Sequence, residues 1–259
     1  MKNLKKITAL IMALIMVFAL CACSDDDDAK GKVEPSTTAP VAEESASPDK
    51  SLELGTLSGG KYANDYFGFG CELDDQWTYA DEDQLLSMIQ ATADLIDDEN
   101  FKDDILDADM FYDMMAVYYD GVTSMNVVVQ NIGAAYGALL DEETMVDETI
   151  KVLPDQLATA SMDVQSCEHV TVEFAGADHD GILTHSTVNG GDVYQLQTYV
   201  KVGKYVAVVT LSSPLEDNLD PMLGFFYAVH VIVVSVQHGK RYLSRFKRQN
   251  NMTYRPFHA

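Results

Sequence analysis

The chain lacks any apolar run long enough to cross a membrane as a helix. Its longest such run, from Ile7 to Leu20, has fourteen residues and is interrupted by Thr8, whereas a spanning helix needs about 20 residues. Three lysines within the first six residues precede it. A short apolar run behind basic residues at an N-terminus is typical of a secretory signal peptide. The sequence therefore predicts export rather than a transmembrane span.

The residues that end this run, Leu20-Cys21-Ala22-Cys23, resemble the lipobox of bacterial prolipoproteins. Cys23 is the better acceptor, because choosing Cys21 would place the bulky Leu20 at the −1 position. The resemblance implies a signal peptide at residues 1–22 and a diacylglyceryl group on Cys23. It also implies the lipid bilayer as a partner, with the protein anchored to the extracytoplasmic face of the cell membrane and carrying fatty chains such as palmitate. The alternative is an ordinary cleaved signal peptide with incidental cysteines.

Basic residues are scarce. The chain has 17 Lys and Arg against 41 Asp and Glu, and its formal net charge of −24 becomes −27 once the three leader lysines are removed. Such a surface repels nucleic-acid phosphates and anionic headgroups, so we expect no nucleic-acid partner. The acidic residues could attract cations, but we favour the simpler explanation that they keep the domain soluble.

Cysteine and catalytic motifs are also scarce. Once Cys23 is lipidated, Cys71 and Cys167 are the two thiols that could form a disulfide in an exported protein, and the sequence leaves their pairing open. We expect neither thiol to be catalytic. The chain contains no G-x-S-x-G, no phosphate-binding loop, no H-E-x-x-H and no dinucleotide fingerprint. The sequence therefore predicts no catalytic residue and no cofactor.

The composition divides the chain into a tether and a domain. Residues 23–60 hold the lipidated cysteine, a run of four aspartates and three prolines, with almost no large apolar residue before Leu52. Such a segment cannot bury enough surface to fold and is expected to be a disordered acidic linker. Residues 61–228 are rich in aromatic and alternating apolar positions, and their length suits one domain.

Hydrophobic periodicity predicts both strands and helices in this domain. The expected strands are a short strand or hairpin in 62–73, a pair at 110–119 and 124–132, and a meander at 168–174, 181–188, 193–202 and 205–212. A turn is expected at Ala175–Asp180. Helices are expected from Gln84 to Ile96, over 141–160 and over 216–228, with Pro154 kinking the second or starting another. This order favours an α+β domain whose antiparallel β-sheet is flanked by helices.

Several segments resemble the PsbP-like domains of many Firmicutes lipoproteins. They are Tyr62–Gly68 with Trp77, Met125–Val129, Tyr194–Gln197 and Tyr205–Thr210. The resemblance covers residues 61–228 and implies an antiparallel sheet flanked by helices. It implies no chemistry, because the motifs are strand and packing signatures and many family members have no assigned activity.

Two acidic groups could hold a metal ion. Asp178, His179 and Asp180, with His185 beyond them, offer ligands suited to Zn²⁺ or Mn²⁺, although the spacing matches no established site and a polar turn is the simpler explanation. The acidic residues of 97–104 offer oxygen atoms to Ca²⁺, but they lack the glycine and glutamate of an EF-hand loop. A loose Ca²⁺ site stays open there.

The end of the chain differs from the rest. Residues 229–259 lose the acidic composition, and residues 236–259 carry six basic side chains and no acidic one. One explanation is a frameshift near residue 228, which we favour. The other is a basic arm that binds the acidic domain or an anionic envelope polymer.

Taken together, these features predict a membrane-anchored extracytoplasmic lipoprotein. Its domain is expected to bind an unknown envelope protein or a small ligand, without catalysis. The alternative is an envelope enzyme or a divalent-metal-binding protein, with a site built from scattered carboxylates and His179.

Overall fold

The computed structural model describes residues 52–81, 83–85, 110–159 and 161–229, together with two short strands, β12 (Val236–Gln237) and β13 (Lys240–Arg241). The predicted signal peptide, Cys23, most of the predicted linker, the predicted helix beyond Leu85 and most of the basic tail lie outside these residues. No helix in the described ranges combines the length and the apolar character that a membrane crossing requires.

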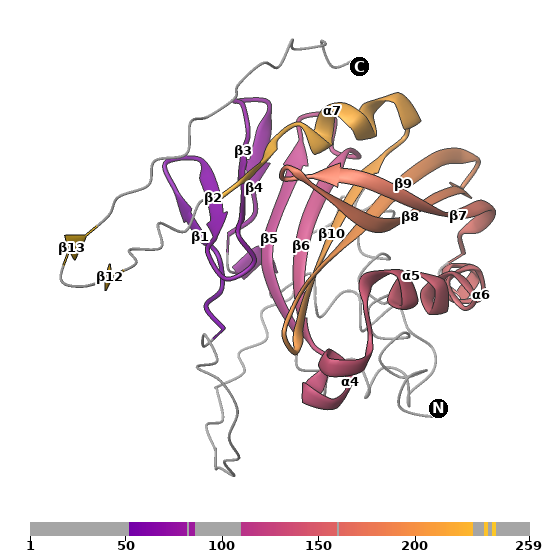
Figure 1. The fold of residues 1–259 in the computed structure, drawn as a ribbon. Coiled ribbons are helices and arrows are strands. Elements are labelled where there is room, and N and C mark those ends of the chain that lie inside the picture. Colours follow the sequence, from indigo (N-terminus) through magenta and orange to yellow (C-terminus); the bar gives the residue numbers. More distant parts are fainter. Residues whose placement is uncertain are drawn as a thin grey trace.

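A seven-stranded antiparallel sheet forms the centre of the domain (Figure 1). Across the sheet the strands follow the order β4 (Trp77–Tyr79), β5 (Met110–Tyr118), β6 (Ser124–Asn131), β10 (Tyr205–Ser213), β9 (Gly191–Val202), β8 (Ala177–Val188) and β7 (Asp163–Phe174). The predicted β5–β6 pair and the four-strand meander are therefore confirmed. The sheet ends at β4 on one side and at β7 on the other.

A smaller antiparallel sheet packs beside it, with the order β1 (Thr56–Ser58), β2 (Lys61–Asn64), β3 (Phe69–Glu72) and β11 (Phe226–Ala228). Of the two possibilities expected in 62–73, a short strand or a hairpin, the structure has the hairpin, formed by β2 and β3. β1 lies upstream of the expected boundary at Lys61. The predicted closing helix is partly wrong: a 3-10 turn at Glu216–Asn218 and the short α7 (Leu219–Leu223) precede β11.

Three helices follow β6. They are α4 (Gly133–Leu139), which the sequence did not predict, α5 (Glu142–Ile150) and α6 (Leu153–Thr159). Asp141 caps α5 by accepting a hydrogen bond from the backbone N–H of Thr144 at 2.9 Å. Pro154 was expected either to kink the helix over 141–160 or to start another. It lies in the first turn of a second helix, α6, where the N–H that proline lacks is not needed.

One expected turn is wrong. Only two residues, Ala175 and Gly176, join β7 to β8, and both have positive φ values of 51° and 86°. This is the geometry of a type I′ turn, which closes a hairpin without splaying its strands. Asp178, His179 and Asp180 therefore belong to β8 and not to a loop.

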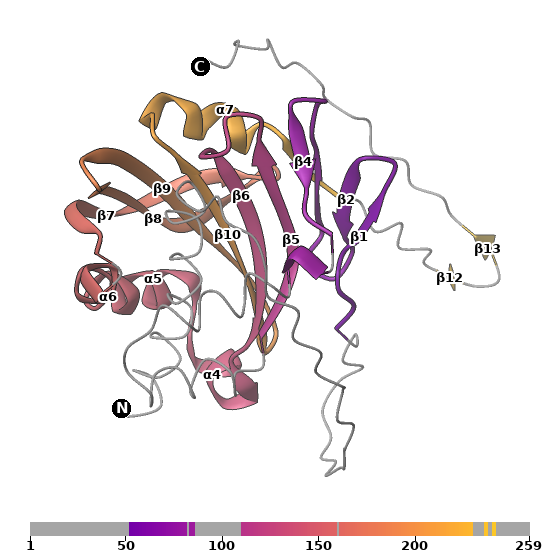
Figure 2. The ribbon, with the colours of Figure 1, turned by 180° about the vertical axis from the view of Figure 1, so that it is seen from behind.

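The elements form layers with a core on each side of the large sheet (Figures 1 and 2). On one side, the small sheet and α7 bury Phe69, Phe226 and Met222 against the sheet. On the other, α5 and α6 bury Val146 and Leu157 against it. The predicted α+β class, with an antiparallel sheet flanked by helices, is confirmed.

Candidate functional site

The four residues predicted as metal ligands do not converge. His179 contacts Glu142 of α5, Asp180 contacts His169 of β7, and His185 contacts Asp192 of β9. Neighbouring side chains on a strand point to opposite faces, so Asp178 and His179 cannot act together from one face. Within the part of the chain that the structure describes, no three His, Cys, Asp or Glu side chains are grouped so that they could hold a metal ion.

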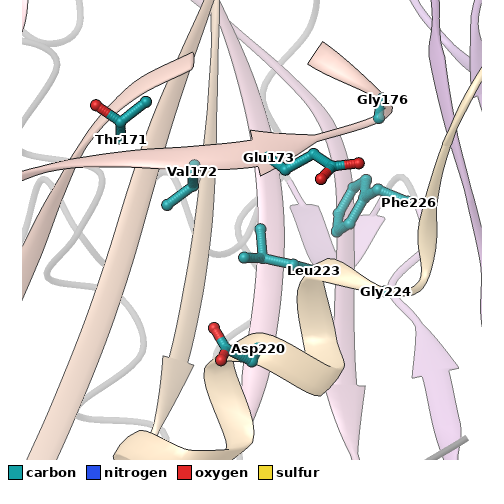
Figure 3. A pocket seen from close by; sticks show the side chains of 9 residues that line it. Thr171, Val172, Glu173, Gly176, Asp220, Leu223, Gly224 and Phe226 are labelled. Atoms are coloured by element: carbon teal, nitrogen blue, oxygen red, sulfur yellow. The ribbon is translucent and has the colours of Figure 1, made fainter. Parts of the chain in front are cut away.

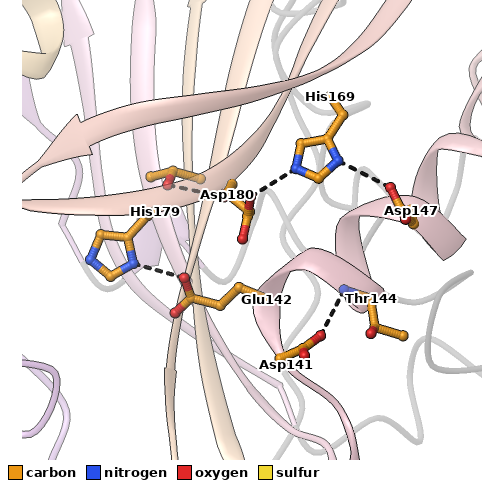
Figure 4. A network of polar contacts seen from close by, with 8 residues as sticks. Asp141, Glu142, Thr144, Asp147, His169, His179 and Asp180 are labelled. Carbon is orange, nitrogen blue, oxygen red and sulfur yellow. Dashed lines mark hydrogen bonds and ion pairs between the residues drawn. The ribbon is translucent and has the colours of Figure 1, made fainter.

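Two of these contacts belong to a polar network that fastens α5 to the sheet (Figure 4). Glu142 accepts a hydrogen bond from the backbone N–H of Lys201 on β9 and contacts Nδ1 of His179 on β8, each at 2.9 Å. His169 on β7 lies between two carboxylates, with Nδ1 3.0 Å from Asp147 and Nε2 2.8 Å from Asp180. One short helix is thus tied to three strands.

Neighbouring carboxylates raise the pKa values of His169 and His179. The pKa of His169 is raised chiefly by its hydrogen bond to Asp180, with Asp147 adding to the effect. The pKa of His179 is raised chiefly by its hydrogen bond to Glu142, against the opposing effect of partial burial. A histidine can donate from both ring nitrogens only when it is protonated. The carboxylates therefore favour the protonated form of each ring, and these contacts fasten α5 to the sheet.

Both predicted cysteines are free thiols. Cys71 is fully buried on β3, with its sulfur 3.9 Å from that of Met125, and burial raises its pKa to about 12. Cys167 lies on β7 beside the hydroxyl of Thr184, and partial burial also raises its pKa. His169 follows on the same strand, a neighbour that the sequence-based expectation overlooked, but carboxylates contact both its ring nitrogens. The protonated thiols are poor nucleophiles.

A groove with a volume of about 410 Å³ opens between the end of β7, the β7–β8 turn and α7. It is lined by Thr171, Val172, Glu173, Ala175, Gly176, Asp220, Leu223, Gly224 and Phe226. Figure 3 shows the Leu223 side chain directed toward β7 and the Phe226 ring beside Glu173. The groove thus combines apolar side chains with two carboxylates.

An aromatic cluster holds the groove in shape. Phe174, the last residue of β7, has its ring centroid 4.9 Å from that of Phe226 on β11 and 5.1 Å from that of Phe69 on β3. Phe174 is 1% exposed and Phe226 is 3% exposed. The end of the large sheet and the small sheet are therefore packed together directly beneath the groove, which rests on rigid elements.

Three carboxylates surround this groove without a basic partner. Glu173 and Asp220 line it, and Asp178 is the residue of β8 directly opposite Glu173. All three are exposed, and none takes part in a side-chain hydrogen bond or ion pair within the described ranges. Like charges directly opposite each other on neighbouring strands are destabilising. A cation bound here would relieve that repulsion.

A buried layer of neutral polar side chains, which the sequence did not predict, lies on the face of the large sheet that α5 also covers. It forms two rows across the strands: Asn126, Thr210 and Gln197, then Ser124, Ser212, Gln195 and Thr184. Each is less than 5% exposed, and neither side-chain polar atom of Gln195 has a hydrogen-bond partner in the described part. In the sequence, Gln195 and Gln197 alternate with Leu196 and so resemble solvent-facing positions.

Comparison with known proteins gives distant structural similarity. The solution structure of cyanobacterial PsbP (CyanoP) from Synechocystis sp. PCC 6803 has a TM-score of 0.40 at 11% identity, covering 71% of this chain and 98% of that one. A Bacteroides thetaiotaomicron VPI-5482 structure has a TM-score of 0.32 at 10% identity, covering 74% and 51%. LpqN, involved in cell envelope biogenesis of Mycobacterium tuberculosis, has 0.32 at 11%, covering 62% and 83%.

No protein-family model matches the chain, and no curated protein matches it in sequence. A PsbP structure is thus among those to which the chain is similar. At these TM-scores the similarities assign no activity or partner to this chain. The lipoprotein character and the Firmicutes connection stay predictions.

Proposed function

We propose that this protein is an exported lipoprotein, anchored to the membrane through Cys23, whose domain binds a partner through the groove between β7 and α7. The groove carries the binding part of this proposal, and the Leu20–Cys23 sequence supports the anchor. Its apolar floor of Val172, Leu223 and Phe226 is bordered by the exposed carboxylates of Glu173 and Asp220, which lack basic partners in the described part. This combination fits a ligand that carries both apolar and basic groups, such as a basic amphipathic polypeptide segment.

Binding accounts for the described side chains better than catalysis does. The thiols of Cys71 and Cys167 have raised pKa values, so both are protonated near neutral pH. His169 and His179 are held by carboxylates of α5 and β8.

In the competing metal hypothesis, a metal ion would raise the melting temperature and His179→Ala would remove that rise. Melting the apoprotein with Zn²⁺, Mn²⁺ or Ca²⁺ is expected to show no shift that depends on His179.

The groove is tested with a fluorescent peptide of alternating lysine and valine, followed by fluorescence polarisation. We expect wild-type protein to bind it, and Glu173→Gln combined with Asp220→Asn to weaken binding several-fold. Added salt should shrink the difference, because exposed charges are screened. The control is Asp75→Asn combined with Glu143→Gln, two exposed carboxylates outside the groove lining. Equal affinity in the two double variants would contradict the groove as the binding site.

The anchor is tested separately in bacteria that express the full chain. Wild-type protein should incorporate labelled palmitate and sediment with membranes, whereas Cys23→Ser should lose the label and leave the membrane fraction. Cys21→Ser is the matched control, because it keeps the −1 alanine and the acceptor, and it should behave as wild type. Palmitate incorporation into Cys23→Ser would refute the assignment of the anchor.

A further inference from the structure

β7 is a long strand at the edge of the large sheet, and no described strand pairs with its outer side. It has twelve residues, about twice the length of a typical strand. It is the last strand of the large sheet and pairs only with β8 in the described part. An edge strand presents a row of unpaired N–H and C=O groups, which is a template for pairing with another extended chain.

The hairpin geometry tells which backbone groups face outward. The two-residue turn makes Phe174 and Ala177 a hydrogen-bonded pair, and such pairs then recur at every second residue. The residues between them, Cys167, His169, Thr171 and Glu173, direct their N–H and C=O groups to the open edge. His169, Thr171 and Glu173 are also exposed, so, among the described residues, a segment of the edge spanning roughly 20 Å has no strand paired to it.

This edge is continuous with the groove. Thr171, Val172 and Glu173 belong both to the open segment of β7 and to the groove lining. A strand added alongside β7 would therefore pass along the groove, with its side chains between β7 and α7. The backbone would supply affinity and the groove would supply selectivity, which is how sheet edges recognise extended peptides.

The acidic side chains along this edge determine which kind of extended segment can pair with β7. Along this stretch, Glu168 and Glu173 are exposed on β7, Asp178 lies opposite Glu173, and Asp220 of α7 lines the groove together with Glu173. A second copy of this chain would bring one acidic edge against another, which like-charge repulsion disfavours. A segment with lysine or arginine side chains would instead neutralise the opposed pair of Glu173 and Asp178.

We propose that the domain binds a basic, extended segment of a partner protein by adding it as an eighth strand to β7, antiparallel or parallel, next to α7. This inference rests on the proposed function of the groove and names the binding mode. β7 through β10 and α7 hold the edge rigid. The partner segment orders on binding, and its basic side chains meet the acidic residues of the β7–β8 hairpin.

Backbone pairing is tested with two N-methylated forms of the lysine–valine peptide. One carries methyl groups on the valine amides and the other on the lysine amides. In an added strand only alternate N–H groups face β7, so one form should lose at least about tenfold in affinity and the other should bind nearly as well as the parent. If both forms bind equally, strand addition is wrong while the groove proposal stands; if the parent peptide does not bind, the groove proposal itself fails.

A variant of β7 gives an independent test. Thr171→Pro removes one outward N–H without breaking the ladder to β8, since proline is tolerated on an edge strand when its N–H side faces solvent. It should weaken peptide binding about tenfold, while Thr171→Val, which keeps the N–H, should not. Unchanged binding by a folded Thr171→Pro variant would overturn the proposal. If that variant does not fold, the N-methylated peptides test whether the peptide pairs with β7.

The chain's own basic residues are the competing occupant. Deletion of residues 236–259 removes six basic side chains and no acidic one. We expect this deletion to leave the affinity for the peptide unchanged. A rise of about tenfold would show that the tail occupies the edge in the same molecule, and it would overturn the assignment to an external partner.

Discussion

Single side chains in this domain take their properties from the elements that surround them. His179 and His169 each meet a carboxylate from another element, so their pKa values are raised. Cys71 is enclosed by the core between the sheets, so its thiol is kept protonated. From the sequence, His179 was identified as a candidate metal ligand, His169 was not singled out, and the partners of both were missed. Glu142 lies 37 positions from His179 and Asp147 lies 22 from His169, and no local pattern links such positions.

The first prediction concerns the pH dependence of stability. A pKa raised by folding means that the His179–Glu142 contact stabilises the fold fully below the ordinary value of 6.5 and that this contribution is lost as pH rises through the raised value. His179→Gln should therefore cost about 1 kcal/mol near pH 6 and much less near pH 9. Urea denaturation at both pH values measures the difference.

The matched control for this experiment is His185→Gln. His185 contacts Asp192 and stacks on Tyr194, both on the neighbouring β9, so it does not fasten α5 to the sheet. The loss of α5 contacts can be followed by amide exchange of 142–150. If His179→Gln leaves that exchange unchanged at low pH, the His179–Glu142 contact does not fasten α5 to the sheet.

The second prediction concerns thiol reactivity. In the native protein, N-ethylmaleimide should modify Cys167 well before Cys71, because Cys167 is partly exposed while Cys71 is fully buried with a pKa of about 12. Peptide mapping after timed labelling without reductant assigns the sites, and Cys167→Ser serves as the control. Finding a peptide that links Cys71 to Cys167 would contradict the free thiols of the structure.

Strands that bury one face can be predicted closely from local sequence patterns. β5, β6, β9 and β10 were predicted within a few residues, because alternating and β-branched segments pack on a half-buried surface. The segment 175–180 was predicted wrongly, because its polar residues suggested a loop. The structure needs only Ala175 and Gly176 for the turn, and His179 and Asp180 find partners on α5 and β7.

The third prediction concerns the contact between β8 and β9. A Cβ added at Gly181 would lie 2.5 Å from the backbone oxygen of Gln197, so Gly181→Ala must push the strands apart. We expect a loss of roughly 1–3 kcal/mol in the free energy of unfolding. Gly191→Ala is the control, because its added Cβ would meet its nearest atom, the Val188 oxygen, at 3.6 Å. Equal melting temperatures for the two variants would contradict the close approach.

At the scale of the whole molecule, two sheets must act as one domain. Asp113 of β5 joins them: its carboxylate accepts hydrogen bonds from the Tyr62 hydroxyl, the Asn64 amide and the Gly55 backbone N–H, at 2.5–2.6 Å. It lies at a register shift between Tyr112 and Met114, a β-bulge that re-aims its side chain toward the small sheet. The groove depends on this joint, because Phe226 belongs to the small sheet and Val172 to the large one.

The fourth prediction tests that joint. Asp113→Ala leaves two buried donors unpaired and should lower the free energy of unfolding by about 2–3 kcal/mol. Amide exchange should increase first in β2, β3 and β11. The lysine–valine peptide should bind more weakly, because Phe226 of β11 lines the groove. Asp75→Ala, at an exposed position, is the control. Uniform exchange across both sheets would show that Asp113 does not couple them specifically.

The sequence by itself determined the class of the domain and most of its strands, because burial of one face imposes a period that can be counted along the chain. It also determined the acidic character and the predicted anchor, which depend on composition and on neighbouring residues. Only the tertiary structure decided that Cys71 and Cys167 stay apart, that Glu142 meets His179, and that β7 and α7 enclose a groove. These features join residues far apart in the chain, and their geometry is set by how the two sheets and α5 pack.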